Sequence, residues 1–332
     1  QLASLAPLLQ ERGVEISILT RRYPGMAPRE MVNGIPVYRL PIPGSKPVRA
    51  LSFTLSALLL LRKLKPDLIH AHELLSPTTT AMLGKGLWNI PILTTVLGGG
   101  QLGDVSKVLR GRVGKYRAAQ IARDVDAFIV LSQEIDNELA SIGVPTERRH
   151  FIPNGVDASV YRPLSLAQKS DLRARLGIPE GPALVYTGRF EPEKRVNNLV
   201  QVWPQIKALY PDASLILVGD GSQRPLLEEM AVEGVHFAGR VDNVLPYLQV
   251  ADVFVLPSAR EGLSNSLIEA MAAGLTAVVT SVGGALDVIE DGVNGFLVAP
   301  DDLDGLRSAL AQVLSRPEVR ASAGTAARQT IE

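Results

Sequence analysis

Short apolar runs alternate along the whole chain with longer stretches in which apolar residues recur every three or four positions. The first kind of run predicts buried strands and the second predicts amphipathic helices. The predicted strands lie in VEISILT, DLIHAH, PILTTV, DAFIVLS and HFIP in the first half, and in ALVYTG, SLILVGD, VHFAG, VFVLPS and TAVVTS in the second. The helices predicted between them include residues 76–87, 107–122, 196–209 and 302–314.

This alternation is typical of βαβ units, in which parallel strands are covered by helices on both faces. Two such sets meet at the string PNGVD, residues 153–157. We therefore predict an α/β fold of two doubly wound, Rossmann-like parallel-sheet domains facing a cleft, with boundaries at 1–157 and 158–332. Ligands of such folds bind where the carboxyl ends of strands meet the amino ends of helices.

The two ends of the chain interrupt this pattern. The sequence opens on a helical stripe of leucines at positions 2, 5, 8 and 9, which Gly13 terminates, and it stops inside another helical pattern at Glu332. We therefore expect a fragment that lacks its first strand and loop, and also its last helix.

Composition narrows the class of protein. Hydrophobic residues make up 46% of the chain and charged residues 20%, which is enough apolar material for a core. The absence of cysteine excludes a disulfide scaffold, a cysteine nucleophile and a thiolate metal site. No run approaches the roughly 18 apolar residues of a membrane span, and there is no signal peptide, so we expect a cytoplasmic protein.

The net charge of zero conceals two unlike halves. Residues 1–157 hold 19 basic and 13 acidic side chains, whereas residues 158–332 hold 15 and 21. Six of the cations fall between Lys107 and Arg123 without an intervening acid. Such a stretch is either a solvated face or a peripheral contact with an anionic membrane at the cytoplasmic face. Aromatic residues are only 5%, which argues against nucleic acid as a partner.

The string PSAREGLSNSLIEAMAAG, residues 257–274, carries the strongest chemical signal. It follows a buried strand and begins a helix near Ser264, so the helix dipole and free backbone N–H groups there favour an anion. Glu261 in the loop and Glu269 on the helix can each accept two hydroxyl hydrogen bonds, as a ribose and a sugar require. For either glutamate alone a solvated surface charge is the commoner explanation, but the whole string, spaced this way after a buried strand, favours a binding site.

A second string, TGRFEPEKR, directly follows the strand ALVYTG. Gly188 allows a tight turn, and Arg189 and Lys194 supply cationic donors that match a diphosphate. The alternative is a charged turn in which neighbouring glutamates pair with these cations. Three further strings at strand ends are weaker and could be ordinary loops: LVGDGSQRPLLEE, AGRVDN around Arg240 and Val241, and LGGGQLGD around Gly98, Gly99 and Gly100.

Metal binding is not predicted. His70 and His72 lie at a strand end, with no third ligand nearby for zinc. Two Asp-x-Asp strings, at residues 124–126 and 302–304, lie at helix boundaries, where acids have a structural explanation.

Taken together, these strings resemble the retaining family 4 glycosyltransferases of the GT-B fold. The resemblance runs along nearly the whole chain and is most specific in FAGRVDN, FVLPSAREGLSNSLIEAMAAG and VGGALDVIEDGVNGFLVAPDDLDGL. It implies a metal-independent hexosyltransferase of polysaccharide biosynthesis, without a cofactor. That enzyme would move a hexose from a UDP- or GDP-sugar to a glycan or lipid-linked acceptor.

The resemblance also implies roles for individual residues. Arg189 and Lys194 would hold the donor diphosphate, and Glu261 would bind a donor-sugar hydroxyl near the reacting carbon. Glu269 would bind the ribose. The phosphate would meet the amides of Gly262, Leu263 and Ser264, beside the turn at Gly188, and the base would meet Arg240 and Val241. The acceptor-side candidates are Gly98, Gly99, Gly100 and His72.

One position departs from the family pattern, because Leu97 stands where many members carry a histidine. Two alternatives to the transferase stay open at this point. They are another GT-B enzyme, such as a nucleotide-sugar epimerase, and a non-catalytic module that binds a nucleotide-sugar or a glycan.

Overall fold

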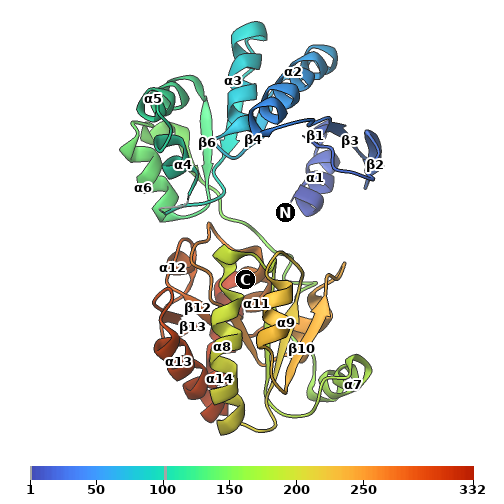
Figure 1. The fold of residues 1–332 in the computed structure, drawn as a ribbon, viewed down its shortest axis with the longest axis vertical. Coiled ribbons are helices and arrows are strands. Elements are labelled where there is room, and N and C mark those ends of the chain that lie inside the picture. The colour runs from blue at the N-terminus through green and yellow to red at the C-terminus, as the bar shows by residue number, and fades with distance from the viewer. Residues whose placement is uncertain (1, 101–102) are drawn as a thin grey trace. The chain divides into compact units, whose positions relative to one another are not determined.

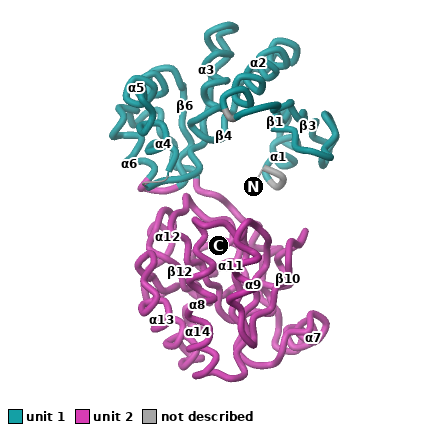
Figure 2. The backbone as a smooth tube through the Cα atoms, in the orientation of Figure 1, with its two compact units in different colours: residues 1–131, 135–152 teal, residues 132–134, 153–332 magenta. Residues whose placement is uncertain are grey.

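The structure is a computed structural model that describes residues 2–100 and 103–332. Its backbone forms two compact units (Figures 1 and 2). Unit 1 comprises residues 1–131 and 135–152, and unit 2 comprises residues 132–134 and 153–332.

Unit 1 is built from seven strands and six helices within the described residues. In chain order these are α1 (Leu2–Glu11), β1 (Ile18–Arg21), β2 (Arg29–Val32), β3 (Ile35–Leu40), α2 (Lys46–Leu64), β4 (Ile69–His72), α3 (Ser76–Trp88), β5 (Ile92–Thr95), α4 (Asp104–Leu109), α5 (Gly114–Asp124), β6 (Ala127–Val130), α6 (Gln133–Ser141) and β7 (Arg149–Phe151). Strands β4, β5, β6 and β7 form one parallel sheet in sequential order, as βαβ units require.

The remaining three strands form a second sheet with the order β1-β3-β2. β1 and β3 are parallel, but β2 is antiparallel to β3, which departs from the all-parallel prediction. Asn33 and Gly34 connect β2 to β3 with φ values of 49° and 78°. Two successive positive φ values are those of a type I′ hairpin turn, for which Asn-Gly is the favoured sequence.

Unit 2 is a doubly wound domain. Its elements are α7 (Leu166–Leu176), β8 (Ala183–Thr187), α8 (Val196–Leu209), β9 (Ser214–Val218), α9 (Arg224–Met230), β10 (Val235–Gly239), α10 (Leu245–Val250), β11 (Val253–Leu256), α11 (Asn265–Ala272), β12 (Thr276–Thr280), α12 (Ala285–Val288), β13 (Gly295–Val298), α13 (Leu303–Ser315) and α14 (Pro317–Ile331). The six strands are parallel in the order β10-β9-β8-β11-β12-β13.

The core of unit 2 explains why its strands read as continuous apolar runs. All residues of β8, β9, β11 and β12 are buried, since helices cover both faces of the sheet. Trp203 of α8 is fully buried, and its indole N–H donates to the Glu233 carbonyl at 3.1 Å. At the amino ends of β8 and β11, Asp252 accepts from Lys169, Arg173 and the Ala183 N–H at 2.7–2.8 Å.

Every strand predicted from the sequence is present, whereas β2, β3 and β13 were not predicted. The helix predicted over residues 107–122 is wrong as a single element, because α4 ends at Leu109 and α5 begins at Gly114. A Cβ at Gly114 would collide with the Leu109 carbonyl, so glycine permits the close turn between the two helices. The stretch between Lys107 and Arg123 therefore does not form one basic helix.

Candidate functional site

The strand order of unit 2 creates a topological switch point. The chain moves outward from β8 to β9 and β10, and then returns to place β11 on the other side of β8. The loops after β8 and β11 therefore diverge above neighbouring strands, and ligands of doubly wound sheets bind in the resulting crevice. These two loops are TGRFEPEKR and PSAREGLS, the strings with the strongest chemical signals in the sequence.

Lys194 and Glu261 meet across this switch point. The Lys194 ammonium lies 2.6 Å from Glu261 Oε1, and the same oxygen accepts a hydrogen bond from the buried Ser258 hydroxyl at 2.7 Å. The side chains of Lys194 and Glu261 are 18% and 10% exposed. The pair is therefore fixed in place where the loops after β8 and β11 meet.

Arg189 is the exposed member of the predicted diphosphate pair. Its side chain is 68% exposed and contacts Glu193 at 3.3 Å. Its backbone is held by a hydrogen bond, because the Tyr186 hydroxyl donates to the Arg189 carbonyl at 2.9 Å. Burial raises the pKa of Tyr186, so this hydroxyl stays protonated and remains a donor. Gly188 lies so close to that hydroxyl that a Cβ would come within 2.7 Å of it.

The loop from Gly262 to Ser264 leads into α11, and hydrogen bonds to two of its backbone carbonyls hold it in place. The Gly262 carbonyl accepts from the Gly284 N–H at 2.5 Å, and the Leu263 carbonyl accepts from the Asn154 side-chain amide at 2.8 Å. In a trans peptide, the C=O and the following N–H point in opposite directions. The N–H groups of Leu263 and Ser264 therefore point away from these partners. Ser264 is the N-cap residue of α11, but its side chain bonds to Ser266 instead of capping the helix.

Glu269 lies one turn inside α11 and interacts with Tyr161, whose hydroxyl donates to the carboxylate. Burial raises the pKa of Glu269 above the ordinary 4.5, although the hydrogen bond from Tyr161 opposes this effect. Burial and the negative charge of Glu269 raise the pKa of Tyr161 to about 12. The carboxylate is thus partly shielded from water. In such surroundings its hydrogen bonds with sugar or ribose hydroxyls are stronger.

The Gly-Asp-Gly string after β9 supports the Arg189 loop. The Gly188 N–H donates to the Val218 carbonyl at 3.0 Å, and the Phe190 N–H donates to the Asp220 carbonyl at 2.9 Å. A Cβ at Gly219 would collide with the Gly188 carbonyl. This string therefore shapes the neighbouring loop, a role that its sequence alone did not indicate.

Arg240 and Val241, predicted to meet the base, follow the outermost strand β10. That strand lies two positions from β8 in the sheet, which corresponds to roughly 10 Å. Arg240 is exposed and Val241 is partly buried. The structure therefore places this segment along the same edge of the sheet as the other donor-side candidates, but away from the Lys194–Glu261 pair.

The acceptor-side candidates lie in unit 1. The loop with Gly98, Gly99 and Gly100 is closed by side chains: the Gly100 N–H donates to Glu138 at 2.7 Å, and the Leu97 N–H donates to Asp104 at 3.1 Å. Asp104 is buried and does not cap α4, because Gly103 occupies the N-cap position. Gln101 and Leu102, from the same string, lie outside the described residues.

His72 lies at the end of β4 beside His70. Their ring centroids are 4.4 Å apart, and His70 Nε2 lies 2.7 Å from the Thr95 hydroxyl. Burial and the neighbouring His72 lower the pKa of His70 to about 4, and burial also lowers the pKa of His72. Both rings are therefore neutral at physiological pH.

The Asp-x-Asp strings have structural partners. Asp124 pairs with Arg123, and Asp126 with Lys85, while Asp302 accepts the Gly305 N–H at the start of α13. Across residues 2–100 and 103–332, no group of three or more histidines or acids could hold a metal ion.

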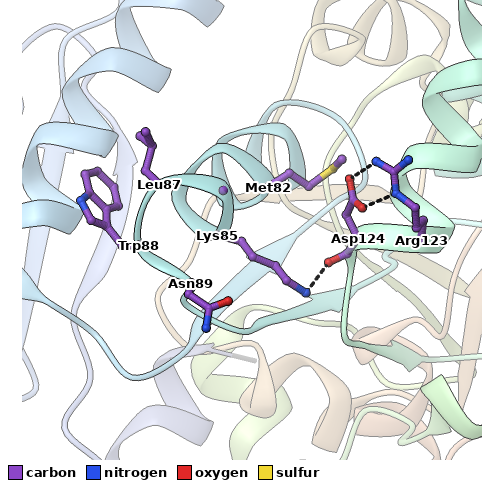
Figure 3. Close-up of a pocket in the computed structure, with 8 residues that line it drawn as sticks. Met82, Lys85, Leu87, Trp88, Asn89, Arg123 and Asp124 are labelled. Atoms are coloured by element: carbon purple, nitrogen blue, oxygen red, sulfur yellow. Dashed lines mark hydrogen bonds and ion pairs between the residues drawn. The ribbon is translucent and has the colours of Figure 1, made fainter.

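A surface pocket of about 700 Å³ lies in unit 1, between the ends of α3 and α5 (Figure 3). Lys85 and Arg123, the cations that line it, both bond to Asp124: Lys85 to its carbonyl at 2.8 Å and Arg123 to its carboxylate at 2.6 Å. Each of the two cations also has a carboxylate partner, Asp126 for Lys85 and Asp124 for Arg123. None of the described helices is long and apolar enough to cross a membrane.

Comparisons with known proteins identify the family. Residues 181–316 match the family described as glycosyl transferases group 1, and residues 1–155 match the glycosyl transferase 4-like domain. The chain belongs to the family 4 glycosyltransferases. The glycosyltransferase is 30% identical over 281 residues to glycogen synthase of Mycobacterium tuberculosis, with 81% of this chain covered. It spans 65% of that relative, which is less than two thirds of its length.

Solved structures agree on the fold. The glycosyltransferase superposes on sucrose-phosphate synthase from Thermosynechococcus elongatus with a TM-score of 0.83 at 24% identity, covering 99% of this chain and 86% of the other. It also superposes on HepE of Anabaena in complex with UDP-glucose, with a TM-score of 0.76 at 22% identity and coverage of 90% and 82%. The predicted α/β, GT-B fold is thereby confirmed.

Several residues around the candidate site were not singled out by sequence reasoning. Tyr161, Tyr186, Ser258 and Asn154 contact predicted site residues or their loops, yet none carries a distinctive local signal. Gly283 is different, because it lies in the quoted string VGGALD. At a φ of +53°, a Cβ there would collide with the Glu261 carbonyl, so the double glycine marked a close approach of two loops.

Proposed function

We propose that this glycosyltransferase transfers a hexose from a UDP- or GDP-sugar to a glycan or lipid-linked acceptor, with retention of configuration and without a metal. The observation that carries the proposal is the Lys194–Glu261 pair, held at 2.6 Å across the switch point of unit 2. A cation and a hydroxyl acceptor side by side suit the junction between a diphosphate and a sugar. The complex of HepE with UDP-glucose, on the same fold, supports this donor class.

In the proposed reaction the nucleoside diphosphate departs from the sugar before the acceptor hydroxyl attacks the same face, and the departing phosphate oxygen takes the proton of that hydroxyl. Lys194 and Arg189 neutralise the charge that develops on the leaving diphosphate. The N–H groups of Leu263 and Ser264, at the amino end of α11, add donors there, because the carbonyl that precedes each of them in its peptide, of Gly262 and of Leu263, is bonded on the opposite side. Glu261 binds a sugar hydroxyl, and Glu269 binds the ribose.

Thermal shift with UDP- and GDP-sugars tests the donor site. A donor at 100 times its Kd should stabilise the protein by about 2.7 kcal/mol. Lys194→Ala should weaken donor binding by about 2 kcal/mol, roughly thirtyfold, because a charge-assisted contact is lost. Lys85→Ala is the matched control, since it removes an ion pair of the same 2.6 Å length in unit 1 and should leave the shift intact.

Three outcomes separate this proposal from its alternatives. Stabilisation by neither class of nucleotide-sugar would refute the donor site. Stabilisation without transfer to any acceptor would favour a non-catalytic binding module. Where product forms, NMR of its anomeric proton reports retention or inversion, and an inverted product would contradict the proposed stereochemistry.

A further inference from the structure

Helix α2 has apolar residues on two opposite faces, of which only one is covered. Phe53, Ala57 and Leu61 are buried against unit 1. On the outer face, Val48, Leu51, Leu55 and Leu59 are 49%, 60%, 53% and 73% exposed. The outer residues recur at i, i+3, i+7 and i+11, so they form one stripe along the helix. A surface helix normally carries polar residues on this face, and a contiguous exposed apolar stripe marks an interaction site.

The neighbouring helix also exposes apolar side chains. α3 packs beside α2, and the hydroxyls of Thr54 and Thr80 lie 3.0 Å apart between them (Figure 1). α3 exposes Leu83 by 47%, Leu87 by 60% and Trp88 by 36%. Tryptophan is enriched where a protein meets the boundary between lipid and water, because its ring is apolar and its N–H is polar.

The charged residues of α2 itself have a single sign. Residues 46–66 contain five lysines and arginines and no acidic residue. Arg62 and Lys63, in the last turn of α2, are exposed beside Leu59. Long cationic side chains in this position can lie along an apolar surface while their charges reach an anionic layer.

This charge pattern selects between two occupants of the surface. If α2 of a second copy covered the stripe, cations would face cations in either helix orientation, because residues 46–66 offer no carboxylate to pair with them. An anionic lipid surface satisfies both features, since headgroups attract the cations and the acyl boundary accepts the leucines.

We propose that α2 is a membrane-docking helix of this glycosyltransferase, lying in the headgroup region of an anionic bilayer with Leu51, Leu55 and Leu59 inserted. This surface is distinct from the stretch between Lys107 and Arg123, which two separate helices divide. It also does not depend on the proposed donor site, since all donor-side candidates lie in unit 2.

Vesicle flotation of the full chain tests the proposal. Wild type should bind vesicles that contain phosphatidylglycerol and bind pure phosphatidylcholine much more weakly. Replacing Leu51, Leu55 and Leu59 together by Gln should reduce binding to anionic vesicles about tenfold or more. Replacing Arg62 and Lys63 by Gln should reduce it by about fivefold per cation. Leu166→Gln is the matched control, because this leucine of α7 is 87% exposed and lies in unit 2.

Each other outcome overturns the proposal. Unchanged vesicle binding by the triple leucine variant would refute it, and so would loss of binding on neutralising Arg112 and Lys115 alone. A wild-type dimer that the leucine variant converts to a monomer, without vesicle binding by either, would show that a second copy covers α2. The thermal shift with a nucleotide-sugar should persist in the leucine variant, which reports folding and separates this test from that of the donor site.

Discussion

At the scale of single residues, Glu269 shows how burial prepares a group for a ligand. Its carboxylate lies on α11 with Tyr161 as partner, and burial raises its pKa. The folded chain therefore holds this proton more tightly than the unfolded chain does. The contribution of Glu269 to stability is complete below the ordinary value of 4.5 and is lost as the pH rises through the raised pKa.

If Glu269 binds the ribose as proposed, donor binding has the opposite dependence on pH, because ionisation leaves both carboxylate oxygens as acceptors. We expect donor affinity to fall as the pH is lowered through the raised pKa of Glu269, and Glu269→Gln to flatten this dependence. The variant should also bind donor more weakly at neutral pH and melt slightly higher without ligand. Calorimetric titration across the pH range measures the effect, with the exposed Glu318→Gln as control. An unaltered pH profile in Glu269→Gln would remove this residue from the donor site.

At the scale of elements, the site depends on loops that pack backbone against backbone. The loop after β12 approaches the loop after β11 so closely that Gly283 leaves no room for a side chain beside the Glu261 carbonyl. The loop after β9 approaches the loop after β8 in the same way through Gly219. Glycines at these strand ends therefore set the position of the charged residues, which lie on the neighbouring loops.

A pair of glycine variants separates the effect of this loop packing on donor binding from the effect of backbone strain on stability. Gly283 and Gly292 both have positive φ values, of 53° and 75°, but a Cβ at Gly292 would meet nothing within 4 Å. Each change to Ala should cost about 1 kcal/mol of stability through the left-handed backbone. Gly283→Ala should in addition weaken donor binding by at least about tenfold, because the Glu261 loop must shift. Equal donor affinity in the two variants would contradict the proposed coupling between the loops.

At the scale of the whole molecule, the charge is divided between the units. Counted by the units of the structure, unit 1 holds 19 basic and 11 acidic side chains, and unit 2 holds 15 and 23. The donor-side candidates thus lie in a unit of net charge −8, which repels an anionic ligand at long range. In the proposed function, donor binding therefore rests on Arg189, Lys194 and backbone N–H groups at short range.

This division predicts how salt affects donor binding. A ligand steered by an attractive field associates more slowly as salt is added. For this protein, we expect the association rate constant of a nucleotide-sugar to stay level or to rise, because salt screens the repulsion from unit 2. Stopped-flow measurements over a range of salt concentrations test this expectation. A steep fall with added salt would mean that a positive field guides the donor.

The sequence by itself determined the alternation of strands and helices and the chemistry of the loops between them. Both are local properties, because hydrophobic period and the residues at a strand end depend on neighbours in the chain. The helix at residues 196–209 was predicted at its observed bounds for this reason, and TGRFEPEKR could be identified as cationic wherever it folded. The hairpin at Asn33-Gly34 also has a local signal, the turn dipeptide.

Tertiary structure alone decided which of these parts meet. Lys194 and Glu261 are 67 residues apart and touch only because the sheet places β8 beside β11. The same limit applies to α2: residues 51–61 form the longest apolar run of the chain, which by itself cannot show which side is covered. The packing of unit 1 buries Phe53, Ala57 and Leu61 and leaves Leu51, Leu55 and Leu59 exposed, because burial depends on contacts distant in sequence.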